Sequence, residues 1–192
     1  MNIANKITIA RIGLTFVFMI FLFMNGLWPK VAGFAVFILA AVSDLLDGKI
    51  AKKYNMVTDF GKLMDPIADK ILVLSALIAF VQMQIIEGWM VLVIFSREIL
   101  VTSLRLFALN KGKVLSAGRS GKHKTFSQMV LISLILCFIL FKEIRKNFYT
   151  WNPSWEASFS VAINIVMWIV VVLTLYSGIA YLWKNRKIIT DI

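Results

Sequence analysis

The sequence predicts an all-α integral membrane fold, a bundle of six transmembrane helices. Of its 192 residues, 60% are hydrophobic and only 16% are charged, against about 25% charged residues in soluble domains. This composition excludes an ordinary soluble globule and a disordered chain, and the lone Cys137 excludes a disulfide framework. The net charge of +11 indicates membrane lipids with anionic headgroups or a phosphate-bearing substrate as partners, and no nucleic acid.

Stretches without charge mark the expected helices in chain order. A helix needs about 20 mostly apolar residues to cross the hydrocarbon core of a bilayer. Four uncharged stretches come near this length, whereas one further stretch stops before Asp44 and another contains Arg97, Glu98 and Arg105. In order, the six stretches are 12–29, 31–43, 71–86, 89–110, 125–141 and 157–183. Their short connections predict a compact bundle, which we expect to form a single membrane domain over residues 1–192.

The basic residues predict the orientation of the bundle. With six spans both termini share one side, and of the 21 Lys and Arg residues only four fall on the other side: Lys30, Lys142, Arg145 and Lys146. The positive-inside rule therefore places both termini in the cytoplasm of a multi-pass protein of the cell (inner or plasma) membrane. Because no small-residue cleavage site precedes Trp28-Pro29-Lys30, the first apolar run is expected to be a span or an anchor and not a removable signal peptide.

Acidic residues are scarce, and half of them lie between Asp44 and Asp69. On a helix, positions 44, 47, 48 and 51 share one stripe, and positions 61, 65 and 69 share another. Asn55 and Thr58-Asp59 between them are typical of a turn and a helix start. Two antiparallel neighbouring helices can then direct four carboxylates, Asp44, Asp47, Asp65 and Asp69, into one pocket at the cytoplasmic side. Such oxygen donors favour hard divalent cations, Mg²⁺ or Mn²⁺.

The small residues on these stripes, Gly48, Ala51 and Gly61, leave room for a bulky ligand beside the metals, and a phosphate-bearing molecule is the natural candidate. The alternative is that the Asp residues are interfacial caps and ion-pair partners of neighbouring lysines. Clustered ionisable residues in a membrane are usually functional, and this favours the metal site.

The run Asp44-x2-Asp47-Gly48-x2-Ala51-Lys52-x8-Gly61-x3-Asp65-x3-Asp69 resembles the signature of the CDP-alcohol phosphatidyltransferase family. The one departure is Lys52, which stands where the family has Arg; lysine keeps the charge and loses the bidentate geometry toward phosphate. Four runs are similar to the branch of this family that uses sn-glycerol 3-phosphate as acceptor: Asn5-x-Ile7-Thr8-x2-Arg11, Phe60-Gly61-Lys62-x2-Asp65-Pro66-x-Ala68-Asp69-Lys70, Arg97-Glu98-x3-Thr102-x2-Arg105 and Gly121-Lys122-x-Lys124-Thr125.

The resemblance implies transfer of a phosphatidyl group from CDP-diacylglycerol to an alcohol, with release of CMP. It implies two metal ions held by Asp44, Asp47, Asp65 and Asp69, with Asp69 also acting as the general base. It also implies a homodimer, and contacts to CDP-diacylglycerol from Asn5, Thr8, Asp47, Gly48, Ala51, Lys52 and Gly61. Asn5 and Thr8 are equally compatible with plain helix capping.

An acceptor that carries a phosphate needs its own cations. Arg97 and Arg105 lie two helical turns apart in an apolar stretch, where we expect both to be buried, and Lys122 and Lys124 precede the next span. Because a buried Arg in a membrane is costly, an anionic partner is expected, and these four residues are the candidates for binding the acceptor phosphate. The alternative is that the two arginines pair with Glu98, Asp59 or the metal-site carboxylates.

Two other functions stay open at this point. The same family uses inositol phosphate, phosphatidylglycerol or serine as acceptors, and the basic set argues against serine without separating glycerol phosphate from inositol phosphate. A cation carrier would also use an acidic cluster, although its ionisable residues are expected near the bilayer midplane and here they gather at the ends of spans.

Overall fold

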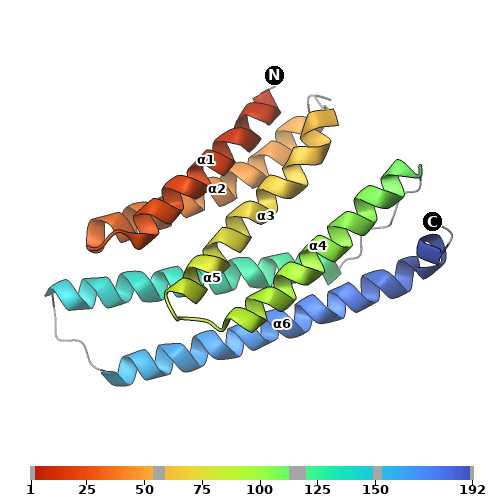
Figure 1. Cartoon of the computed structure of the whole chain (residues 1–192). Helices are drawn as coiled ribbons and strands as arrows, with labels where there is room; N and C mark the ends of the chain where they lie inside the picture. The colour runs from red at the N-terminus through yellow and green to blue at the C-terminus, as the bar shows by residue number, and fades with distance from the viewer. Residues whose placement is uncertain (1–2, 54–58, 113–119, 149–152, 191–192) are drawn as a thin grey trace. The chain divides into compact units, whose positions relative to one another are not determined.

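The computed structural model of the chain is all-helical (Figure 1). Its helices are α1 (Ile3–Phe23), α2 (Leu27–Lys53), α3 (Asp59–Gln82), α4 (Gly88–Asn110), α5 (Ser120–Phe148) and α6 (Pro153–Thr190). The structure describes the backbone of residues 3–53, 59–112, 120–148 and 153–190, and the side chains of residues 9–43, 68, 70–108, 111–112, 121, 124–148 and 154–186. The expected stretches correspond to these helices in the same order, although 12–29 runs past the end of α1 at Phe23 and 71–86 runs past the end of α3 at Gln82. Helix α3 begins at Asp59, where a helix start was expected.

Two helices of the described chain are long and apolar enough to cross a membrane by length and composition, Lys124–Phe148 and Ser154–Arg186. Three apolar segments are shorter: Ile9–Phe23, Leu27–Ser43 and Lys70–Gln82. Charged residues inside α2, α3 and α4 shorten or interrupt their apolar runs, since an ionisable side chain is costly within hydrocarbon. These features are those of a membrane protein, and the count of six spans stays a prediction.

The residues group into two compact units. The first comprises Met1–Ala79 and Ile135–Pro153, and in it α1 packs against α2. The rings of Phe18 and Phe37 meet at a centroid distance of 5.5 Å in this contact. A Cβ atom at Gly33 would lie 3.3 Å from Cβ of Phe21, so glycine is what lets the two helices approach so closely.

A tight connection joins α1 to α2 in this unit. Gly26 has a φ of +104°, a conformation that costs glycine little and other residues much. Lys30, in the first turn of α2, donates a hydrogen bond from Nζ to the carbonyl oxygen of Leu22. That oxygen lies in the last turn of α1, where carbonyls lack helical partners and the helix dipole favours a cation.

The second unit comprises Phe80–Leu134 and Ser154–Ile192, and so contains α4, the first part of α5 and α6. Val101 and Ala108 of α4 pack with Tyr181 of α6 and with the partly buried Leu104. Trp89 and Trp168 form a second α4 to α6 contact, ring edge to ring face, with centroids 5.4 Å apart. These contacts fix the faces of α4 and α6 that meet.

Helix α6 has two distinct faces along its length. Its exposed face is apolar at intervals of three or four residues: Val161, Ile165, Trp168, Val172, Leu175, Ile179 and Trp183. Its buried face begins apolar with Ile163, Met167 and Val170 and then becomes polar, with Thr174, Ser177, Tyr181 and Asn185. The buried polar face lies in the half of α6 that contacts Arg97 and Arg105 of α4.

Candidate active site

The acidic residues of the predicted metal site lie in two helices. Because α2 continues to Lys53, positions 44 and 47 are about one turn apart in it, and positions 65 and 69 are about one turn apart in α3. The side chains of these four Asp residues are outside the described residues. The helical spacing assumed for them is therefore present in the backbone, and their convergence on a metal stays a prediction.

The donor chemistry of this set fits a divalent metal of the Mg²⁺ class, since all four side chains supply hard carboxylate oxygens. Among the residues whose side chains the structure describes, no three His, Cys, Asp or Glu residues come together to hold a metal. The side chains of the four Asp residues are not among those described, so this absence does not bear on the predicted metal site.

The side chains of the residues predicted to contact CDP-diacylglycerol are also outside the described residues. Their helices are described and their side chains are not: Asn5 and Thr8 in α1, Gly48, Ala51 and Lys52 in α2, and Gly61 in α3. The side chain of Lys122, in α5, is also outside the described residues. Their predicted roles stay predictions.

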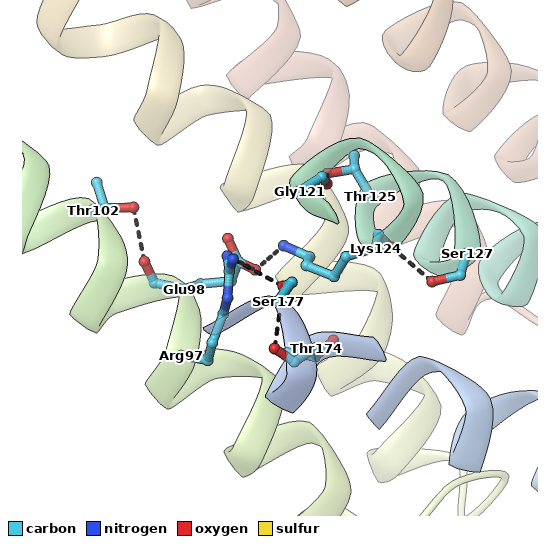
Figure 2. A network of polar contacts seen from close by, with 9 residues as sticks. All are labelled: Arg97, Glu98, Thr102, Gly121, Lys124, Thr125, Ser127, Thr174 and Ser177. Carbon is cyan, nitrogen blue, oxygen red and sulfur yellow. Dashed lines mark hydrogen bonds and ion pairs between the residues drawn. The ribbon is translucent and has the colours of Figure 1, made fainter. Parts of the chain in front are cut away.

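The second unit contains a buried group of charged residues, shown in Figure 2, which we call the cationic cluster: Arg97, Glu98 and Lys124. Lys124 Nζ forms an ion pair with Oε1 of Glu98, and Arg97 Nη1 lies 3.4 Å from the same oxygen. Glu98 is 7% exposed and Lys124 is 4% exposed. Two cations thus share one carboxylate oxygen among the described side chains.

Local hydrogen bonds hold the backbone around the cluster. Thr102 Oγ1 donates to the carbonyl oxygen of Glu98 at 2.7 Å, and Ser127 Oγ donates to that of Lys124 at 2.8 Å. Hydroxyl side chains commonly bond to the preceding helical turn in this way. The cluster therefore rests on two regular helical segments, and its charged groups project from them.

Arg97 makes its second contact with α6. Its Nη2 donates to Oγ of Ser177 at 3.0 Å, and Ser177 Oγ in turn donates to the carbonyl oxygen of Thr174 at 3.2 Å. The buried Nε of Arg97 has no hydrogen-bond partner within the described part of the chain. Part of the guanidinium is therefore held by the protein, and part is left for another acceptor.

Arg105 differs from Arg97 in its surroundings. Its side chain is exposed, so the expectation that both arginines are buried is wrong for this residue. Its Cζ lies 5.9 Å from the centroid of the Tyr181 ring, within the range of a cation–π contact. The guanidinium thus contacts the ring of Tyr181 in α6, while the Arg105 side chain as a whole remains exposed.

The structure brings together Arg97 and Lys124 of the four predicted phosphate-binding residues, with Glu98 between them. Arg and Lys side chains gathered in this way are groups that can bind a phosphate. The contacts from Ser177 and Tyr181 were missed from the sequence. A sequence pattern could have pointed to them, because polar residues recur at intervals of three or four along one face of the mostly apolar α6. These residues are Thr174, Ser177, Tyr181 and Asn185, and all four are buried.

The family model for CDP-alcohol phosphatidyltransferase matches residues 1–177, which is most of the chain. The chain belongs to this family of membrane transferases.

Curated relatives refine the comparison. The chain is 39% identical over 196 aligned residues to the CDP-diacylglycerol–glycerol-3-phosphate 3-phosphatidyltransferase of Bacillus subtilis, with 96% of this chain and 95% of the relative covered. It is 35% identical to the protein of the same name from Rickettsia bellii, with 97% and 96% covered. It is also 35% identical to a probable phosphatidylglycerophosphate synthase of Mycobacterium tuberculosis, with 97% and 82% covered.

Proposed function

We propose that the chain transfers the phosphatidyl group of CDP-diacylglycerol to sn-glycerol 3-phosphate, giving phosphatidylglycerol phosphate and CMP. Family membership supports the reaction class, and the names of relatives similar over their whole length support this acceptor. The observation in the structure that carries the proposal is the cationic cluster, in which Arg97 and Lys124, two of the predicted phosphate-binding residues, lie close together around Glu98. Neighbouring Arg and Lys side chains of this kind are suited to bind the phosphate of a phosphorylated acceptor.

The residues of the chain divide the reaction between them. The acceptor hydroxyl attacks the phosphorus of the phosphatidyl group, the bond from that phosphorus to the CMP oxygen breaks, and the hydroxyl proton passes to the carboxylate of Asp69. Asp44, Asp47, Asp65 and Asp69 would hold two Mg²⁺ or Mn²⁺ ions, which when bound neutralise the pyrophosphate and the departing CMP. Asn5, Thr8, Asp47, Gly48, Ala51, Lys52 and Gly61 bind CDP-diacylglycerol in this proposal.

Arg97, Arg105, Lys122 and Lys124 bind the acceptor phosphate and orient its hydroxyl. Positioning of this kind is a large part of catalysis in phosphoryl-type transfer, where the protein has little covalent chemistry to perform. The contacts of Arg97 and Lys124 to Glu98 support the proposal because they hold both cations in place before the acceptor binds.

We place the reaction at the cytoplasmic side of the cell membrane, in a single domain of six spans with both termini in the cytoplasm. The apolar exposed face of α6 supports lipid contact, since large exposed apolar surfaces mark membrane or protein interfaces. Resemblance to the family supports a homodimer.

The purified protein in detergent, given radiolabelled CDP-diacylglycerol and a panel of acceptors, tests the function. We expect label in phosphatidylglycerol phosphate and release of CMP with glycerol 3-phosphate. Chelation with EDTA is expected to abolish the reaction, and Mg²⁺ or Mn²⁺ to restore it, because the carboxylates alone would repel the pyrophosphate.

Inositol phosphate, phosphatidylglycerol and serine are the other acceptors of the panel. A product from one of these, and none from glycerol 3-phosphate, would leave the family intact and overturn the proposed acceptor. Full activity after chelation would contradict the metal site.

A further inference from the structure

We propose that α6 is the element that positions the two arginines for the acceptor phosphate, through Ser177, Gly178 and Tyr181. This inference rests on the proposed function, in which Arg97 and Arg105 bind that phosphate. It gives α6 a role in acceptor recognition that neither the signature of acidic residues nor the basic residues of α4 and α5 supply.

Ser177 fixes one end of the Arg97 guanidinium. Because its own hydroxyl proton goes to the carbonyl oxygen of Thr174, its oxygen is left as an acceptor for Nη2 of Arg97 (Figure 2). The residue is 1% exposed, so water does not compete for this bond. A directed hydrogen bond of this kind sets the plane of the guanidinium, which a nonspecific apolar contact would not do.

Gly178 gives the Arg97 side chain the space it occupies. A Cβ atom at this position would lie 3.0 Å from Cγ and 3.6 Å from Nε of Arg97. The aliphatic stem therefore packs directly on the α6 backbone, and any larger residue would displace it. Nε, which has no partner among the described residues, lies on this same stem.

Tyr181, one helical turn after Ser177, places its ring beneath the Arg105 guanidinium. The hydroxyl of Tyr181 is buried without a hydrogen-bond partner in the described chain, so the contact with Arg105 is through the ring. Arg97 and Arg105 are eight residues apart in α4, and Ser177 and Tyr181 are four apart in α6. One helical face of α6 thus contacts both cations.

Steady-state kinetics of four variants test this inference. Ser177→Ala is expected to raise the KM for glycerol 3-phosphate about three- to tenfold, the loss expected for one hydrogen bond to a charged group. Gly178→Ala is expected to raise it about tenfold or more, because the displaced Arg97 no longer meets the phosphate. Tyr181→Leu is expected to raise it about threefold, and Tyr181→Phe, which keeps the ring, is expected to behave as the wild type.

Matched controls lie in the same chain. Ser158 of α6 is exposed and donates the same kind of bond to a preceding carbonyl, that of Ser154, at 3.1 Å; Tyr176 of α6 is exposed; and Gly13 has no atom within 4 Å of an added Cβ. Ser158→Ala, Tyr176→Leu and Gly13→Ala should leave the KM for glycerol 3-phosphate unchanged. The KM for CDP-diacylglycerol should also stay unchanged in the Ser177 and Tyr181 variants.

A second measurement needs no turnover. Glycerol 3-phosphate should raise the melting temperature of the wild type by mass action, and this rise should shrink in Ser177→Ala and Tyr181→Leu and persist in Tyr181→Phe. Equal rises in both KM values, or a ligand-induced stabilisation that the variants do not change, would overturn the positioning role. Failure of the wild type to form phosphatidylglycerol phosphate, with the ligand-induced stabilisation still sensitive to these variants, would instead refute the proposed function alone.

Discussion

Glu98 supplies the carboxylate of the cationic cluster. Its buried carboxylate pairs with Lys124 through an oxygen that also lies near Arg97. Removing one partner of a buried ion pair is strongly destabilising, because the other charge is left buried without compensation. Glu98 therefore has a structural role whatever anion the cluster binds.

Glu98→Gln should lower the free energy of unfolding by about 3 kcal/mol, measured as thermal unfolding in detergent. The double variant Glu98→Gln with Lys124→Gln should recover part of this loss, because it removes the uncompensated charge together with its partner. The double variant should recover stability but not affinity. It should bind glycerol 3-phosphate more weakly than the wild type, since Lys124 is one of the proposed contacts of this ligand.

Glu87→Gln is the matched control, because Glu87 is exposed and substitutions at such sites change stability by no more than about 0.5 kcal/mol. Additive losses in the double variant would contradict the pairing of Glu98 with Lys124.

The sequence predicted which single residues are candidates for binding phosphate. It did not predict which residues they contact. The spacing of Arg97, Arg105 and Lys124 among apolar residues was enough to mark them as candidates. Ser177 and Tyr181 could not be found in the same way, since the face of α6 that meets α4 is set by packing contacts such as Trp89 with Trp168. For the same reason the exposure of Arg105 was mispredicted.

Helices are the scale at which the sequence was most informative. Charged residues mark where apolar stretches stop, and each of the six stretches corresponds to one of the helices α1 to α6, although 12–29 and 71–86 extend past the ends of α1 and α3. Their true ends were harder to predict, because a helix continues past a charge when the backbone remains hydrogen-bonded. Thus α2 extends to Lys53, well beyond Asp44, and α5 begins at Ser120, ahead of Lys124.

The contact of α1 with α2 depends on one small residue. Gly33→Val should lower the melting temperature, because even a Cβ atom there would lie 3.3 Å from Cβ of Phe21; overpacking of this kind costs about 1–3 kcal/mol. Thermal unfolding in detergent measures the effect.

Gly13→Val introduces the same β-branched residue into a helix at an open position, and it should cost much less. Equal losses at the two positions would show that helix propensity, and not the close approach of α1 and α2, determines the effect.

For the whole molecule, composition predicted a membrane protein, and the exposed apolar side chains agree with that class. Orientation is a matter of charge and not of packing, so it was predicted from the loops alone. The metal-site carboxylates illustrate the opposite case, because their convergence depends on how side chains from two different helices meet.

Both termini should be accessible from the cytoplasmic side only. In a Cys137→Ser background, single cysteines introduced at position 2 or position 191 should react with a membrane-impermeant maleimide in inside-out vesicles and not in right-side-out ones. A cysteine in the α5 to α6 connection, at position 150, should show the reverse. Labelling of the two termini from opposite sides would contradict an even number of spans.

The connection between α1 and α2 has a consequence for biogenesis. The Gly26 turn, the Lys30 bond to Leu22 and the contact of Phe18 with Phe37 all join residues close together in the sequence. Contacts so local can form quickly and without the rest of the chain. The first two helices can therefore fold as a hairpin while the ribosome is still translating the remainder, and enter the bilayer as one preassembled insertion unit.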